Sequence, residues 1–136
     1  NVRYEKIGGK TMNSNGYNVY KNNSVNYASK EQLLLMLIDG AVKFAKIGRQ
    51  AILDKNVKRA HESIVKTQDI FTELRATLDT AAGKWAENMF DIYGFINEKL
   101  FAANIKKSVE IMDEVIPLIE EVRDIWYQAE KKSKQG

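Results

Sequence analysis

Few residues of this chain are of types that do chemistry, and they do not form a catalytic pattern. His61 is the single histidine and Lys58 stands three residues before it, so the Glu-x-x-His pairs of di-iron bundles are absent. There is no cysteine for zinc, and Gly8-Gly9-Lys10 is not a phosphate-binding loop. A serine nucleophile would need a base, and His61 has no partner motif, so we interpret it as a partly buried packing residue. We therefore expect no enzyme, no metal and no cofactor.

The charged residues give no other site. Asp113-Glu114 and Glu120-Glu121 fall on the polar side of a predicted helix, which indicates a solvated face. The net charge is +3, from 21 basic and 18 acidic residues that alternate along the chain, so we expect no nucleic-acid partner. Direct membrane insertion is not expected, because no apolar stretch approaches 18 residues. Residues 1–11 lack the layout of a signal peptide, which favours the cytoplasm.

Apolar residues recur at three- and four-residue steps after residue 29, as is typical of amphipathic helices. Ser29 and Gln32 form a capping box, which predicts a first helix from about residue 30 to residue 53. Its apolar stripe is predicted as Leu33, Leu34, Leu37, Ala41, Phe44, Ala45, Gly48 and Ile52.

Three further helices follow the same pattern. The second repeats Val57, Ile64, Phe71 and Leu78 at intervals of seven and is predicted to stop near residues 80–83, at Gly83. The third runs from about residue 85 to residue 104, and its predicted apolar stripe is Trp85, Met89, Ile92, Tyr93, Ile96, Leu100 and Ala103. The fourth begins after the cap residue Ser108 and contains Pro117, which is expected to kink it.

Four helices joined by short connections predict an all-α fold, an antiparallel up-down four-helix bundle with an N-terminal arm or short cap helix. We assign residues 29–133 to the bundle and residues 12–28 to the arm. Residues 1–11 are an extension, natural or added. The arm is rich in Asn and Ser and carries Tyr17 and Tyr20, and two interpretations stay open: a strap that rests on the core, or a movable cover over an apolar groove.

The predicted helices carry more apolar surface than one buried stripe can use. Six consecutive apolar residues run from Leu33 to Ile38, and adjacent helical residues point about 100° apart. Phe90, Phe95, Phe101 and Ile125 also lie beside their main stripes. Such surface on a soluble protein marks a partner site, unless the arm covers it permanently.

Small residues mark places where another backbone could approach closely. For Ala41, Ala45 and Gly48 we favour tight packing inside the bundle. Gly94, in the middle of the third helix, is left open between internal packing and contact with a partner.

Three segments resemble the family of the flagellar secretion chaperone FliS. The run from Asn15 to Lys46, NGYNVYKNNSVNYASKEQLLLMLIDGAVKFAK, is similar to the family's N-terminal signature. The segment IYGFINEKLFAANIKKSVE resembles a second block, and RDIWYQA is similar to the closing segment. Departures from the family pattern are Gly16 for Pro, Tyr27 for Thr, Ile38 for Tyr, and Gly94 and Ser108 for Asp.

The resemblance implies a cytoplasmic chaperone that binds the disordered C-terminal segment of flagellin, prevents premature polymerisation and keeps it competent for type III export. It also implies that the arm moves aside when the client binds. The alternative is a regulatory adaptor that sequesters an anti-sigma factor or a component of the export apparatus. A homodimer stays open. Candidate partner-binding residues, from the signature and the surplus apolar surface, are Tyr17, Tyr20, Ser24, Val25, Leu34, Leu37, Ile38, Ala41, Tyr93, Asn97, Leu100 and Asn104.

Overall fold

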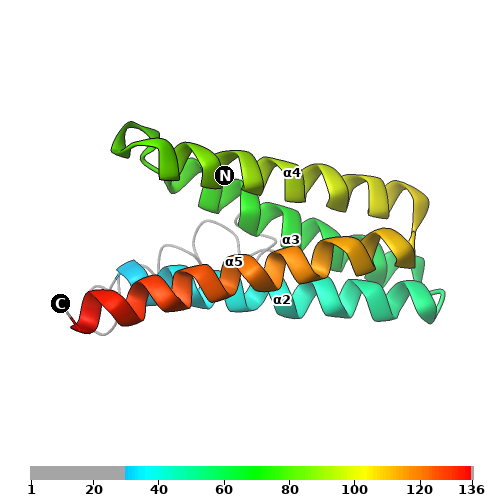
Figure 1. Cartoon of the computed structure of the whole chain (residues 1–136). Helices are drawn as coiled ribbons and strands as arrows, with labels where there is room; N and C mark the ends of the chain where they lie inside the picture. Colours follow the sequence, from blue (N-terminus) through cyan, green and yellow to red (C-terminus); the bar gives the residue numbers. More distant parts are fainter. Residues whose placement is uncertain (1–29, 136) are drawn as a thin grey trace, which may run out of the picture.

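A computed structural model of the chain describes residues 30–135 and contains four long helices (Figure 1). They are α2 (Lys30–Leu53), α3 (Val57–Thr77), α4 (Lys84–Lys106) and α5 (Val109–Gln135), with a short 3-10 helix, η2 (Thr80–Ala82), before α4. Successive helices run antiparallel, so the predicted all-α, up-down four-helix bundle is confirmed. The predicted extension and arm, residues 1–11 and 12–28, lie outside the described residues.

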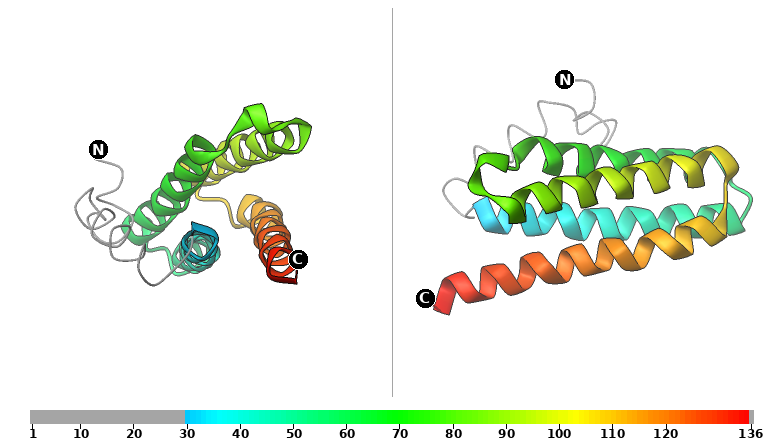
Figure 2. Two further views of the ribbon diagram at one scale, coloured as in Figure 1. Left: turned by 90° about the vertical axis from the view of Figure 1, so that its left-hand side faces the viewer. Right: turned by 45° about the horizontal axis from the view of Figure 1, so that its top comes forward.

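Each helix packs against two neighbours. α2 contacts α3, α3 contacts α4, α4 contacts α5, and α5 closes the ring against α2. Figure 2 shows the bundle along its length, with α5 beside α2. Of the four packed pairs, α4 and α5 are joined least extensively. The ring order brings the beginning and the end of the described chain together.

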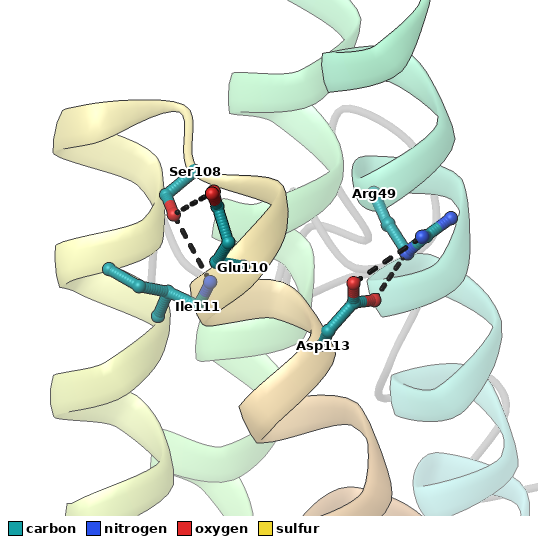
Figure 3. A network of polar contacts seen from close by, with 5 residues as sticks. All are labelled: Arg49, Ser108, Glu110, Ile111 and Asp113. Atoms are coloured by element: carbon teal, nitrogen blue, oxygen red, sulfur yellow. Dashed lines mark hydrogen bonds and ion pairs between the residues drawn. The ribbon is translucent and has the colours of Figure 1, made fainter.

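Polar caps fix where the helices begin. The Arg59 N–H donates to Asn56 Oδ1 at 3.1 Å and starts α3. The predicted cap of α5 is confirmed, because the Ile111 N–H donates to Ser108 Oγ at 3.1 Å (Figure 3). Glu110 lies in the first turn of the same helix, where the helix dipole favours a negative charge.

The predicted end of the second helix differs from the structure. α3 ends at Thr77, a few residues earlier than predicted, because Leu78 is extended and Asp79 caps a separate 3-10 turn. Gly83 follows that turn and precedes α4 with φ of 125°, a conformation that favours glycine. α5 continues through Pro117, the predicted site of a kink, to Gln135.

The buried stripe of α2 is offset from the predicted one. Its buried members are Leu35, Ile38, Ala41, Val42, Ala45, Gly48 and Ala51. Leu34, Leu37, Phe44 and Ile52 pack against the core but are only partly buried. Because residues 33–38 are all apolar, the pattern alone does not fix which side of the helix faces inward; contact with α3 and α5 does.

The remaining core follows the predicted stripes, with changes at the helix ends. Val57 and Trp85 are exposed, because they lie at the start of their helices, beyond the packed centre. His61 is also exposed, so the prediction of a partly buried packing residue is wrong. The fully buried side chains of α3, α4 and α5 include Ile64, Phe71, Leu74, Tyr93, Ile96, Leu100, Met112, Val115 and Ile119.

The small residues of α2 serve packing inside the bundle, as expected. A Cβ on Gly48 would stand 3.0 Å from Ile64 Cγ1, so α2 and α3 approach closely there. Gly94 is also explained internally. Its missing Cβ would stand 2.7 Å from Arg75 Nη2, so the guanidinium of Arg75 occupies that space.

Candidate partner-binding surface

An apolar groove runs along the outer side of the bundle between α4 and α5. Ile92 and Phe95 line it from α4, and Leu118, Val122 and Ile125 line it from α5, around a hollow of about 350 Å³. Phe95 is 51% exposed, although its side chain is large and apolar. These two helices are the least extensively packed pair, so side chains on their facing flanks stay accessible.

A second hollow extends the groove toward the start of α4. It has a volume of about 450 Å³ and is lined by Trp85 from α4 and by Ile125 and Ala129 from α5. Ile125 lines both hollows, so they lie next to each other. We define the α4–α5 groove by its large apolar residues, Trp85, Ile92, Phe95, Leu118 and Ile125. From Trp85 to Phe95 it spans about 15 Å of helix.

An aromatic cluster lies behind the Trp85 end of the groove. The rings of Trp85 and Trp126 meet edge to face with centroids 5.2 Å apart. Trp126 Nε1 donates a hydrogen bond to Tyr93 Oη at 2.7 Å, and the Tyr93 ring lies 5.7 Å from the Phe71 ring. Burial raises the pKa of Tyr93 to about 12, although the hydrogen bond from Trp126 acts in the opposite direction. The exposed Trp85 is thus connected through ring contacts to the core.

Carboxylates dominate the rim of the groove. Asp91 and Glu121 line the hollow that holds Phe95, and Asp124 lines the hollow that holds Trp85. Within residues 30–135 these three carboxylates make no salt bridge. Lys132 is the one basic residue that lines either hollow, and it lies at the Trp85 end.

The other carboxylates of α5 attach it to its neighbours. Asp113 accepts from Arg49 Nε at 2.5 Å, and Glu120 pairs with Lys46 at 3.1 Å, both across to α2 (Figure 3 shows the first pair). The hydrogen bond to Asp113 raises the pKa of Arg49. Glu114 pairs with Lys99 of α4. The two predicted acidic pairs therefore lie on polar surfaces, where three of their four members hold helices together.

Exposed apolar side chains also occur outside the groove. Phe101 and Ile105 are 60% and 67% exposed on α4, one turn apart from each other, and Met36 is exposed on α2. Leu53 and Val57 flank the turn between α2 and α3. None of these side chains lines either hollow of the groove.

Among the described residues, no group of three or more His, Cys, Asp or Glu side chains is placed to hold a metal ion. None of the helices from α2 to α5 is long and apolar enough to cross a membrane.

Eight of the predicted partner-binding residues lie in the described part of the chain, and none lines the α4–α5 groove. Ile38, Ala41, Tyr93 and Leu100 are fully buried in the core, so in this conformation they support the bundle and offer no surface to a partner. Leu34 and Leu37 are partly buried against the same core. Tyr17, Tyr20, Ser24 and Val25 lie outside the described residues.

The two predicted asparagines join α4 to α3. Asn97 Nδ2 donates to the Gln68 carbonyl at 3.3 Å and to Thr72 Oγ1 at 3.1 Å. Asn104 Nδ2 lies 3.0 Å from His61 Nδ1, and Asn104 Oδ1 accepts from Lys107 at 2.8 Å. These contacts give both amides a structural role at the α3–α4 interface.

Sequence reasoning identified part of the groove. Phe95 and Ile125 stood out as apolar residues beside their main stripes. Trp85 and Ile92 were assigned to the core stripe of the third helix, and Leu118 was not singled out. In the sequence, these residues are marked by their position at the edge of the apolar side of each helix. Whether a residue at such an edge is buried or exposed depends on how closely α5 packs against α4.

Comparisons with known proteins agree on one family. The family model described as "Flagellar protein FliS" matches residues 13–133. A flagellar secretion chaperone FliS from Bacillus subtilis is 35% identical over 125 residues, which cover 90% of this chain and 93% of the relative. The flagellar secretion chaperone FliS of Vibrio cholerae is 30% identical over 102 residues, 74% of this chain and 75% of the relative. That of Salmonella typhimurium is 29% identical over 108 residues, 78% of this chain and 80% of the relative.

Proposed function

This chain belongs to the FliS family of flagellar secretion chaperones, and from that premise we propose that it binds the disordered C-terminal segment of flagellin in the cytoplasm. Binding there prevents premature polymerisation and keeps flagellin competent for type III export. The observation that carries the proposal is the match to the family over residues 13–133, together with relatives whose names state a secretion chaperone.

The α4–α5 groove supports the proposal by offering a place for such a client. It is lined by large side chains that remain accessible, with Phe95 and Trp85 each 51% exposed. An amphipathic segment can lay its apolar face into a groove of this kind. A disordered client suits it, because the client becomes ordered only on the chaperone and can be released again without unfolding a stable domain.

Simple magnitudes make such binding feasible without ATP. Ordering a disordered segment costs about 2–5 kcal/mol or more, and coupled folding typically buries about 1,000–3,000 Å². At about 25 cal/mol per Å² of apolar surface, burial on this scale exceeds the ordering cost. The losses of translational and side-chain freedom on association, and the desolvation of polar groups, offset most of this gain.

Titration calorimetry with a synthetic peptide of the flagellin C-terminal segment tests the proposal. We expect saturable binding near one to one and a negative heat-capacity change from apolar burial. Trp85 lies in the groove, so its fluorescence should shift when the peptide binds. Absence of binding at tens of micromolar peptide would refute the proposal.

Capture from a cell lysate decides between clients. Retention of flagellin supports the export chaperone, whereas retention of an anti-sigma factor or an export-apparatus component in place of flagellin would support the alternative adaptor role. Sedimentation of the purified protein measures whether it self-associates.

A further inference from the structure

The charge around the α4–α5 groove is one-sided. Three carboxylates, Asp91, Glu121 and Asp124, line its two hollows and make no salt bridge to any residue of the range 30–135. Elsewhere on α5, Asp113, Glu114 and Glu120 are paired with basic residues of the neighbouring helices. Glu121 and Asp124, which border the exposed apolar surface of α5, have no such basic partner among the described residues.

From this arrangement we propose that the α4–α5 groove selects an amphipathic partner helix of about three turns that carries Lys or Arg beside its apolar stripe. The inference rests on the proposed function, because it describes the segment of the client that occupies this groove. The length follows from the span between Trp85 and Phe95, about 15 Å of helix. Ile92, Leu118 and Ile125 receive the apolar stripe.

The rim explains why the basic residues must flank the stripe. Asp91 lies on α4 and Glu121 on α5, so carboxylates stand on both sides of the hollow that contains Phe95. A helix seated between them brings its flanking positions near both. Cations there gain charge complementarity, whereas acidic residues meet like charge as they approach.

The charge that borders the groove also differs between its two ends. Lys132 lines the hollow at the Trp85 end, whereas the hollow at the Phe95 end is lined by Asp91 and Glu121 without a basic residue. The bound helix should therefore carry its basic residues over the Phe95 end and tolerate an acidic residue over the Trp85 end.

Two synthetic 14-residue peptides test the proposal on the full chain. Both carry Leu at helical i, i+3, i+4 and i+7 spacing, and the positions beside the Leu stripe are Lys in one and Glu in the other. An exposed carboxylate facing a cation changes affinity by up to about fivefold. Over three carboxylates we expect the Lys peptide to bind about tenfold or more tightly than the Glu peptide at low salt. The preference should shrink in 0.5 M NaCl, because salt screens exposed charges.

Charge reversal on the chaperone provides the second part of the test. The double variant Glu121→Lys/Asp124→Lys should remove or invert the preference between the peptides. Glu62→Lys, a single reversal at an exposed carboxylate of α3 away from the groove, is the control for a change in net charge and should leave the preference unchanged. Thermal melts confirm that both variants are folded.

The outcomes separate this inference from the proposed function. If the flagellin segment binds but the two peptides bind equally, or if Glu62→Lys acts as strongly as the double variant, the charge selection is refuted and the proposed function stands. If neither the flagellin segment nor either peptide binds, both fail. If Phe95→Ala instead converts a dimer into a monomer in sedimentation, the groove is an interface between two copies of the chain and the proposal is overturned.

Discussion

Arg75 connects α3 to α4 by a side chain that fits a space left by glycine. Its Nε donates to the Phe90 carbonyl at 3.1 Å, and its guanidinium carbon lies 3.9 Å from the centroid of the Phe90 ring. A Cβ on Gly94 would collide with Nη2 of the same guanidinium. A mid-helix glycine costs about 1 kcal/mol of helix stability relative to alanine. In this bundle that cost allows a cation–π contact and a hydrogen bond between helices.

We expect Gly94→Ala to give no stability gain in the wild-type background, because the added methyl displaces Arg75 from Phe90. In the Arg75→Ala background the same substitution should stabilise the protein by about 1 kcal/mol, the usual helix propensity difference. Urea unfolding of the four proteins measures this coupling. If Gly94→Ala increases the free energy of unfolding equally in both backgrounds, the contacts of the Arg75 side chain do not depend on the glycine.

Because of Tyr93, the free energy of unfolding depends on pH in the alkaline range. Its pKa is raised to about 12 by burial, while in the unfolded chain it keeps the ordinary value near 10. Above pH 10 the unfolded state therefore loses the phenol proton first. The contribution of Tyr93 to the free energy of unfolding is fully present below pH 10. It falls by up to about 2 kcal/mol as the pH rises toward 12.

Tyr93→Phe isolates that contribution. The variant should lose about 1 kcal/mol at pH 7, because Trp126 Nε1 loses its acceptor. Between pH 10 and 12 its stability should fall less steeply than that of the wild type, as followed by urea unfolding at each pH. Parallel curves would mean that Tyr93 ionises equally in the folded and unfolded states.

At the scale of the element, capping decides where α5 begins. Ser108 Oγ accepts from the Ile111 N–H, and no other hydrogen bond of the described residues satisfies that first-turn donor. Ser108→Ala should therefore destabilise the bundle by about 1 kcal/mol. Ser108→Asp retains an acceptor at the same position and should stay close to wild type. Thermal unfolding compares the three proteins, and equal losses in both variants would contradict a capping role.

The contact of α2 with α3 depends on a glycine at its closest point. Because a Cβ at Gly48 already stands 3.0 Å from Ile64 Cγ1, the two additional methyl groups of valine have no room. Gly48→Val should destabilise the bundle by about 1–3 kcal/mol through overpacking. The midpoint of urea unfolding should fall with an unchanged slope; an unchanged midpoint would show that α2 and α3 can separate without loss.

At the scale of the whole molecule, the core and the groove are formed by different aromatic residues. Phe71 is fully buried, whereas Phe95 is half exposed on the outer side of α4. Phe71→Ala should lower the free energy of unfolding by about 3–5 kcal/mol. Phe95→Ala should leave stability within about 0.5 kcal/mol of wild type and weaken binding of the flagellin segment about tenfold or more.

Calorimetry and thermal melts on the same preparations separate the two effects. Val57→Ala is the control, because Val57 is an exposed apolar residue at the α2–α3 turn that does not line the groove. It should change neither binding nor stability appreciably. If Val57→Ala weakens binding as much as Phe95→Ala does, the client does not depend on the α4–α5 groove.

The sequence by itself determined the helices, their order and the family. Apolar residues at three- and four-residue steps and the cap at Ser108 predict where the helices lie. Because the connections between these helices are short, successive helices must run antiparallel and form a bundle. The signature from Asn15 to Lys46 was specific enough to indicate the FliS family, which the family model confirms. Both kinds of information are local, because they depend on residues that are near one another in the chain.

Only the tertiary structure decided which apolar residues face inward and which remain accessible. The run from Leu33 to Ile38 is apolar on every side, so the rotation of α2 was fixed by contact with α3 and α5, which buries Leu35 and Ile38 and exposes Met36. The looser packing of α4 on α5 likewise leaves Phe95 and Ile125 on the surface. The physical reason is that the burial of a side chain depends on neighbours that are distant in sequence. The periodicity within one helix carries no information about those neighbours.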